Sequence, residues 1–334
     1  MKPNTMLAAV AALMLGAQGA AAETVLRFAN FEPPQAVSQA QIFTPWADYI
    51  AEASEGRLRI EFYAGGALGP DPRAQLDLVT NGVADIAWVF PFFTPAQFPQ
   101  TGLAELPMEI PDAVTGTAAM NALFDRGLLH EGLDRVTPLG IFSAPPGIYF
   151  MDFEPQSLDD LRGRRAAASG PIRNQIMENL GLVPVGGVNV GNMAESLSRG
   201  TIDVGQMNFT AAHTFRVNDV AHHAVAIDAG ASMLFVLINN AVLERLSPED
   251  QQVLIDGRAV LEELWNTVIG DAERQAEEAF RAEEGRSVLD FTPEELDALK
   301  QSLAPITDAW VAATPNGAEM LAALREEVQR LQAQ

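Results

Sequence analysis

The sequence predicts an α/β protein in which two lobes are each built around a mostly parallel sheet. Its 334 residues are enough for two domains of ordinary size. Short apolar segments with the two-residue period of strands alternate with segments that have the period of helices, an order typical of parallel sheets covered by helices. This alternation occurs in the first half of the chain and again in the second, which indicates two lobes.

The elements of the first half follow from hydrophobic periodicity and turn residues. Apolar residues recur every three or four positions over 43–53, which predicts a helix, whereas apolar and charged residues alternate over 58–62, which predicts a strand. A Gly-rich loop at 65–69 follows this strand. In chain order we expect a strand at 25–30, a helix at 43–53, a strand at 58–62, a helix at 74–79 and a strand at 85–90.

The second half repeats this pattern and ends in longer helices. Ser247 and Pro248 followed by two acidic residues form a strong helix start, because serine caps the first turn and acids stabilise its positive end. Apolar residues then hold one face as far as Val268, which predicts a long helix that bridges the lobes. We expect strands at 139–142, 164–168, 183–185 and 201–204, helices at 171–180 and before Gly200, and a further helix start at Thr292.

The N-terminal segment 1–22 has the features of a secretory signal peptide. Lys2 precedes an apolar stretch from Met6 to Leu15, and small residues lead up to Ala22. The apolar stretch is shorter than the roughly 20 residues that span a bilayer. We therefore expect cleavage after Ala22, export to the periplasm and no stable membrane insertion of the mature chain.

Composition and missing motifs exclude other classes of function. The formal net charge of −23 makes the chain a poor partner for nucleic acid, because phosphate contacts need Lys and Arg. The chain has no cysteine, which excludes disulfides, thiol catalysis and cysteine zinc sites. It also lacks the G-x-S-x-G, H-E-x-x-H and P-loop motifs. We therefore expect no enzyme activity, no catalytic residue, no cofactor and no metal site.

Aromatic residues cluster where the strand at 85–90 ends. The cluster consists of Trp88, Phe90, Phe92 and Phe93. Ligands of open α/β sheets bind beyond the carboxyl ends of the strands. The cluster is therefore expected to form one wall of a ligand cleft, while any one of its rings taken alone is explained equally well by the core.

A series of short motifs occurs in order over nearly the whole chain. The motifs are Leu26–Ala29, Gly56–Tyr63, Ala67–Asp71, Asn81–Asp85, Phe98-Pro99 with Glu105–Pro107, Leu158–Gly163, Leu180–Val185, Leu197–Asp203, and Leu246–Pro248 with Gln252–Asp256. With these motifs in this order, the chain resembles the extracytoplasmic solute receptors of tripartite ATP-independent periplasmic (TRAP) transporters, the family typified by dicarboxylate and sialic acid receptors.

The resemblance implies two α/β lobes joined by crossing strands and a long interlobe helix, the periplasmic binding protein fold. The first lobe is expected to hold 23–143 and about 233–270, and the second lobe 144–232 and about 271–334. The implied function is that of a periplasmic solute-binding subunit, which captures a small organic ligand such as an organic acid and delivers it to the TRAP membrane subunits. The alternative is a periplasmic ligand sensor that feeds a membrane receptor, and a weaker one is an exported enzyme on the same scaffold.

The chain departs from this family at one informative position. Family members usually carry an arginine on the strand after the Leu-x-Gly turn, where it forms a bidentate pair with the ligand carboxylate. The corresponding residue here is Ala167. Either Arg164, Arg165 or Arg173 supplies the guanidinium from nearby, or the ligand is neutral, zwitterionic or cationic and is held by aromatic and amide side chains.

The residues expected to bind the ligand correspond to contact positions of the family or lie near them. Apolar side chains among them favour a ligand with a ring or another large apolar surface. The expected residues are Asn30, Phe31, Asp71, Trp88, Phe90, Gly147, Ala167, Ser169, Arg173, Val190, Met207 and Asn208.

Overall fold

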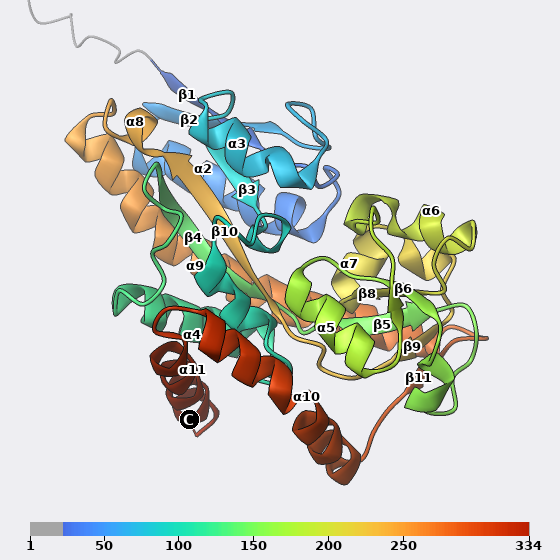
Figure 1. The fold of residues 1–334 in the computed structure, drawn as a ribbon. Coiled ribbons are helices and arrows are strands. Elements are labelled where there is room, and N and C mark those ends of the chain that lie inside the picture. The colour runs from blue at the N-terminus through green and yellow to red at the C-terminus, as the bar shows by residue number, and fades with distance from the viewer. Residues whose placement is uncertain (1–22, 334) are drawn as a thin grey trace, which may run out of the picture.

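The computed structural model describes residues 23–333. The segment 1–22 lies outside the described residues, so its assignment as a signal peptide stays a prediction. Figure 1 shows two lobes, each with its own sheet, and the two C-terminal helices along one side of the molecule. Within the described part of the chain, no helix is both long and apolar enough to cross a membrane.

The first sheet has five strands, of which three come from the N-terminal third of the chain. They are β1 (Thr24–Ala29), β2 (Leu58–Tyr63), β3 (Ile86–Val89), β4 (Val136–Ala144) and β10 (Ser232–Asn239), in the spatial order β2-β1-β3-β10-β4. Leu26 and Phe28 are buried in the core, whereas Arg27 between them points to the other face and pairs with Asp85 at 2.9 Å. Because successive side chains of β1 point to opposite faces of the sheet, one face of the strand packs into this core.

Helices cover both faces of the first sheet, and each face contributes apolar residues to a buried core. Asp112 begins the longest of them by accepting a hydrogen bond from the backbone N–H of Thr115 at 2.8 Å. The helices are a π-helical turn η1 (Ser38–Phe43), α2 (Thr44–Ala53), α3 (Gln75–Thr80), α4 (Ala113–Asp125), α8 (Asn240–Leu243) and the short turns η2 (Pro72–Ala74), η3 (Pro91–Phe93) and η4 (Pro99–Glu105).

The second sheet has six shorter strands. They are β5 (Ile148–Met151), β6 (Arg165–Ala167), β7 (Val183–Pro184), β8 (Val204–Met207), β9 (His223–Val225) and β11 (Ser287–Leu289), in the order β11-β9-β5-β8-β6-β7. The accompanying helices are η5 (Leu158–Leu161), α5 (Pro171–Asn179), η6 (Val190–Asn192), α6 (Met193–Ser198), α7 (Phe209–Thr214) and η7 (Val217–Asp219).

The strand that the sequence predicts at 201–204 begins only at Val204. Thr201 belongs to the turn that follows α6. The side chain of Asp203 accepts hydrogen bonds from the backbone and side chain of Arg165, which fixes this residue at the entry of the strand.

Two segments cross between the lobes and make both sheets mixed. β4 leads into β5, β9 leads into β10, and the two connections are joined where the Gly147 N–H donates to the Gly230 carbonyl at 3.0 Å. β10 is antiparallel to β3 and β4, and β5 is antiparallel to β8 and β9, whereas the other pairs are parallel. The sheets are therefore less uniformly parallel than the alternation of elements predicts, because the crossing strands enter against the direction of their neighbours.

The long helix α9 (Pro248–Ala282) contacts both lobes, as the sequence predicts. Ser247 caps its first turn. In the first lobe, the Trp46 indole N–H donates to the Gly257 carbonyl at 3.0 Å. Near the other end of the helix, the ring of Phe280 packs against Phe150 of the second lobe, with ring centroids 5.6 Å apart.

The two C-terminal helices pack against different lobes. α10 (Pro293–Ala313) packs against α5, and α11 (Gly317–Gln332) packs against α4. Arg325 of α11 pairs with the buried carboxylate of Glu109. The lobe boundaries stay a prediction, and the packing of α11 favours grouping this helix with the first lobe, apart from the rest of 271–334.

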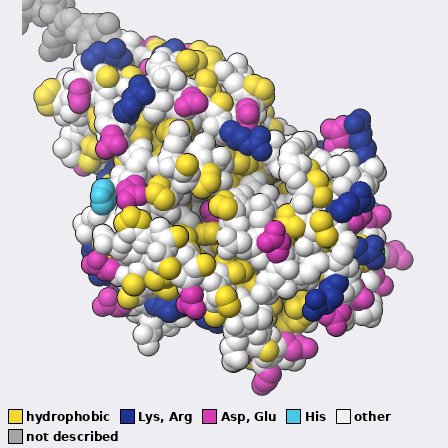
Figure 2. All heavy atoms as spheres, viewed as in Figure 1, with side chains coloured by type: hydrophobic (Ala, Val, Ile, Leu, Met, Phe, Trp, Pro, Cys, Tyr) yellow, Lys and Arg dark blue, Asp and Glu magenta, His cyan; other side chains and the backbone are white. Residues whose placement is uncertain are grey.

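Charged side chains are mixed on the face of the molecule shown in Figure 2. Acidic and basic residues alternate over both lobes there, and the basic residues form no continuous patch on that face. This distribution is typical of a solvated surface.

Candidate functional site

A cavity of about 110 Å³ lies where the two lobes meet, and both lobes supply its walls. The side chains from the first sheet, its loops and α9 are Glu32, Ala36, Val37, Ser38, Trp88, Phe90, Phe92, Ala144, Ser232, Leu234, Trp265 and Ile269. Those from the second lobe and the crossing segment are Pro145, Gly147, Ser169, Arg173, Val190, Gln206, Met207, Asn208, Thr210, Ala211, Thr214 and Phe215.

An aromatic wall, which we define as Trp88, Phe90 and Phe92, forms the side of the cavity at the end of β3. Successive rings are in contact, with centroids 5.2 Å apart between Trp88 and Phe90 and 5.4 Å apart between Phe90 and Phe92. The strand ends at Val89 and Pro91 starts the helical turn η3, which brings Phe92 beside Phe90. Three of the four aromatic residues predicted to form a cleft wall therefore line the cavity, whereas Phe93 does not. All three rings are also largely buried in the core of the first lobe.

Arg173, in the first turn of α5, brings a buried guanidinium to the cavity. Its Nη2 donates to the Ala231 carbonyl at 2.6 Å and to the Ser232 hydroxyl, and its charge lies 5.0 Å from the ring centre of Phe92. Nη1 has only a 3.5 Å contact with the Ser169 carbonyl. Within the described residues, the buried Nε has no hydrogen-bond partner. Arg173 therefore retains donors for an incoming acceptor.

Two titratable groups lie behind Arg173. Burial raises the pKa of Glu105 to about 7, and the charge of Arg173 opposes this rise. Burial also raises the pKa of the Tyr149 hydroxyl. Burial lowers the pKa of Arg173, which the neighbouring Glu105 and Tyr149 offset in part, and an arginine in a protein stays protonated. Near neutral pH Arg173 therefore brings a positive charge to the cavity, and the neighbouring Glu105 is only partly ionised.

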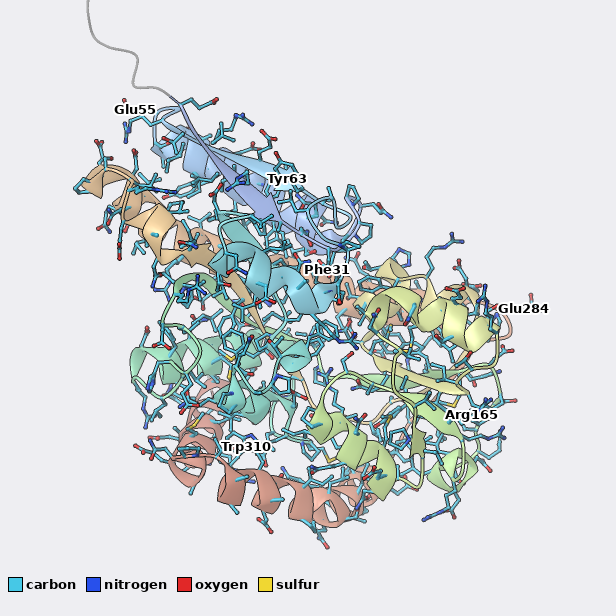
Figure 3. All side chains as sticks on the ribbon, turned by 45° about the horizontal axis from the view of Figure 1, so that its top comes forward. Phe31, Glu55, Tyr63, Arg165, Glu284 and Trp310 are labelled. Carbon is cyan, nitrogen blue, oxygen red and sulfur yellow. The ribbon has the colours of Figure 1, made fainter. Side chains whose placement is uncertain are left out.

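The other arginines considered from the sequence do not line the cavity. Arg165 pairs with Asp203 at 2.8 Å, and Figure 3 shows it on the second lobe away from the boundary between the lobes. Arg164 stacks over the ring of Phe153 at 4.1 Å. Ala167 is fully buried in the core of the second lobe, paired with Gly205 across the sheet. The only arginine among the described residues that line the cavity is Arg173.

Glu32 lies in the cavity wall that the first lobe supplies. Its Oε2 accepts hydrogen bonds from the Trp88 indole N–H at 3.1 Å and from the Ser38 hydroxyl. Burial raises the pKa of Glu32 to about 7, and these two hydrogen bonds oppose the rise. The sequence reasoning missed this residue, because a single glutamate in a loop after a strand carries no signal until Trp88 and Ser38 are placed around it.

Gln206 is a second polar residue that the sequence reasoning missed. It belongs to β8 and is almost fully buried, yet neither its amide nitrogen nor its amide oxygen has a partner within the described residues. Gly147 makes room for it, since a Cβ at that position would lie 1.9 Å from the Gln206 Nε2. An unpaired buried amide is costly, so a ligand that pairs with it gains affinity.

The structure brings most of the predicted site residues together. Asn208 also caps α7 by accepting a hydrogen bond from the Ala211 N–H at 2.8 Å. The predicted residues that line the cavity are Trp88, Phe90, Gly147, Ser169, Arg173, Val190, Met207 and Asn208.

The remaining predicted residues lie outside the cavity lining. Asn30 is buried and binds Gln39 and the backbone of Glu32, and Asp71 is an exposed cap of η2. Phe31 lies on the first lobe where it faces the second (Figure 3), with its ring edge-on to Phe90 at 4.9 Å. Ala167 is part of the second-lobe core. These residues support the site or the fold and reach the cavity only through their neighbours.

No group of three or more metal-binding side chains is found in residues 23–333. Polar groups in the cavity wall are arginine, glutamate, amide and hydroxyl side chains. Such a set can pair with a ligand that carries a carboxylate and hydrogen-bonding groups, and the aromatic wall can pack against an apolar ring.

This chain is similar to known proteins over most of its length. The family model of bacterial extracellular solute-binding protein family 7 matches residues 28–314. The outer membrane transporter protein TsaT of Comamonas testosteroni is 26% identical over 316 residues, which cover 91% of this chain and 90% of that protein.

Solved structures of TRAP solute-binding proteins share this fold. One from Rhodoferax ferrireducens, in complex with copurified benzoate, has a TM-score of 0.85 at 22% identity and covers 92% of this chain and 98% of its own. Another, from a marine metagenome, is specific for aromatic acid ligands and was solved in complex with metahydroxyphenylacetate. It has a TM-score of 0.83 at 25% identity and covers 92% of this chain and 99% of its own. These matches confirm the two-lobed α/β fold and the resemblance to TRAP receptors. The chain belongs to bacterial extracellular solute-binding protein family 7.

Proposed function

We propose that this receptor captures an aromatic organic acid, with the ligand carboxylate on Arg173 and the ring against the aromatic wall. The observation that carries the proposal is the buried guanidinium of Arg173, a residue that lines the cavity and whose Nε has no hydrogen-bond partner among the described residues. A buried cation with free donors favours a carboxylate, because a charge-assisted hydrogen bond is about twice as strong as a neutral one. Arg173 thus takes the part that the family usually gives to the position of Ala167.

The aromatic wall favours a ring as the body of the ligand. Trp88, Phe90 and Phe92 present contiguous ring surface on the same cavity that Arg173 lines. Aromatic pairs in contact gain about 0.5–1.5 kcal/mol beyond the burial of their area. The metagenomic receptor, 25% identical to this chain, is specific for aromatic acids, which supports the same ligand class here.

The receptor is proposed to act in the periplasm after removal of 1–22 and to release its ligand unchanged to the membrane subunits. Arg173 and Gln206 from the second lobe and Glu32 and Trp88 from the first line one cavity. A ligand that contacts both sets stabilises the closed arrangement of the lobes, which is a shift in population.

Isothermal titration calorimetry with benzoate, phenylacetate and mandelate, each paired with its neutral amide, tests the carboxylate anchor. We expect the acids to bind more tightly than the amides. Replacing Arg173 with Gln should weaken acid binding about 30-fold or more, because loss of one partner of a buried charge pair costs about 2–5 kcal/mol. Amide binding should change little.

The matched control is Arg165→Gln, which makes the same substitution at an arginine that pairs with Asp203 outside the cavity. This variant should bind the acids as the unaltered protein does. The proposal is wrong if no aromatic acid binds, or if the acids and their amides bind Arg173→Gln and the unaltered protein alike.

A further inference from the structure

The cavity has a second charged residue, at a different place in its wall from Arg173. Among the described residues that line it, Glu32 and Arg173 are the only two with a formal charge, and they come from different lobes. Of these two residues, only Arg173 has been given a specific part in holding the ligand. Glu32 is buried at 9% exposure, and a buried carboxylate is stable only where its oxygens find hydrogen-bond partners.

The two oxygens of Glu32 are used unequally. Oε2 accepts both hydrogen bonds of the site, from the Trp88 indole and the Ser38 hydroxyl. Within residues 23–333, Oε1 accepts none, although a carboxylate can accept bonds on both oxygens. The indole N–H can only donate, so it holds Oε2 in place and leaves Oε1 as the acceptor for another group.

The aromatic wall separates Glu32 from Arg173. Trp88 is bonded to Glu32, Trp88 and Phe90 are in contact, Phe90 and Phe92 are in contact, and Arg173 lies over Phe92. A ring that packs against this wall with its carboxylate on Arg173 therefore has its opposite part directed along the wall toward Glu32. Glu32 repels the carboxylate of the ligand, whereas Arg173 attracts it. The two residues at opposite ends of the aromatic wall therefore set the orientation of the ligand.

We propose that the cavity selects hydroxylated aromatic acids, with Glu32 Oε1 accepting a hydrogen bond from the ring hydroxyl while Arg173 holds the carboxylate. The inference rests on the proposed function and adds to it the substituent that the ring carries. Glu32 is a specificity-determining residue in this arrangement, because a ring without a donor leaves the buried carboxylate unpaired.

The test compares the three hydroxybenzoates with the three fluorobenzoates by titration calorimetry. Fluorine occupies nearly the space of a hydroxyl and donates no hydrogen bond. We expect at least one hydroxybenzoate to bind about tenfold or more tightly than the fluorobenzoate substituted at the same position. In Glu32→Gln this preference should fall to about threefold or less. The amide oxygen is then occupied by the Trp88 N–H, and the amide nitrogen that faces the ligand cannot accept.

Glu109→Gln is the matched control, since it removes a buried carboxylate that pairs with Arg325 and does not line the cavity. It should keep the preference for hydroxyl, and circular dichroism should show all variants folded. The inference is overturned if hydroxybenzoates and fluorobenzoates bind the unaltered protein equally, or if Glu32→Gln keeps the full preference. Binding of both series that depends on Arg173 but not on Glu32 overturns the inference alone. The proposed function falls as well if neither series binds and phenylacetate and mandelate also fail to bind.

Discussion

Arg173 reaches the cavity from the start of α5, whereas the family position for a carboxylate-binding arginine is the buried Ala167 of β6. The two positions are separated by the loop that contains Ser169, whose carbonyl contacts the Arg173 guanidinium. A guanidinium on a long side chain can reach one point in space from different backbone positions. The departure at Ala167 is therefore compatible with an acidic ligand, and in the proposed arrangement the carboxylate is anchored by the helix and not by the strand.

The pH dependence of binding should reveal the acids around this anchor. The pKa values of Glu105 and Glu32 are both raised to about 7, mainly by burial. As the pH rises through about 7 both groups gain negative charge, whereas benzoate stays an anion throughout. The affinity for benzoate should thus fall, by roughly tenfold between pH 6 and pH 8, as expected for like charges in a poorly solvated site.

Calorimetry of Glu105→Gln at the two pH values checks the cause. This variant should bind benzoate with a weaker pH dependence, because only Glu32 still titrates near the ligand. An affinity for benzoate that does not change between pH 6 and pH 8 in the unaltered protein contradicts this explanation.

The sequence alone predicts those residues of the site that belong to a local sequence pattern. Trp88 and Phe90 stand out as aromatics at a strand end, and Arg173 as a nearby basic residue. Glu32 and Gln206 could not be predicted, because their significance depends on neighbours from distant segments. Gln206 was further hidden by the strand register, since the predicted strand at 201–204 ends where β8 begins.

Among the elements, α9 connects the site to both lobes. Trp265 and Ile269 line the cavity, and one turn later the carboxylate of Glu273 accepts hydrogen bonds from the backbone N–H groups of Phe209 and Thr210, both at 2.8 Å. These N–H groups begin α7, which supplies several residues of the cavity wall. The helix therefore positions α7 through one half-buried acid.

Replacing Glu273 with Ala should lower both stability and affinity. Loss of the acceptor leaves two backbone donors and the Thr210 hydroxyl without this partner, at a cost of about 1–3 kcal/mol in the free energy of unfolding. Urea denaturation followed by circular dichroism measures that cost, and calorimetry with benzoate measures the effect on the cavity.

Glu277→Ala, one turn further along α9, is the control. Glu277 pairs with Arg281 at the surface, so its removal should change the free energy of unfolding by less than about 0.5 kcal/mol. Equal losses of stability in the two variants would contradict a special role for Glu273.

The order and type of the main elements were predictable because periodicity and caps are local. The long helix after Ser247 and the strands at 25–30 and 58–62 are confirmed by the structure. The mixed direction of the sheets was not predictable, because whether a strand returns antiparallel depends on the crossing segments. Their pairing at Gly147 and Gly230 brings together residues far apart in the sequence.

For the whole molecule, the position of the cavity joins ligand binding to the arrangement of the lobes. Its walls come from the first sheet, the second sheet, the crossing segments and α9. The carboxylate anchor belongs to the second lobe, and the aromatic wall and Glu32 belong to the first. A ligand that contacts the anchor and the wall together can do so only when the lobes are closed. It therefore binds the closed arrangement more tightly than the open one, and this difference in affinity is what shifts the population.

A crystal structure of the protein with bound benzoate would show directly where the ligand carboxylate and the ring lie. We expect the carboxylate oxygens within hydrogen-bond distance of the Arg173 guanidinium and the ring packed against Trp88, Phe90 and Phe92. A benzoate bound outside this cavity, or one whose carboxylate points away from Arg173, would contradict this expectation.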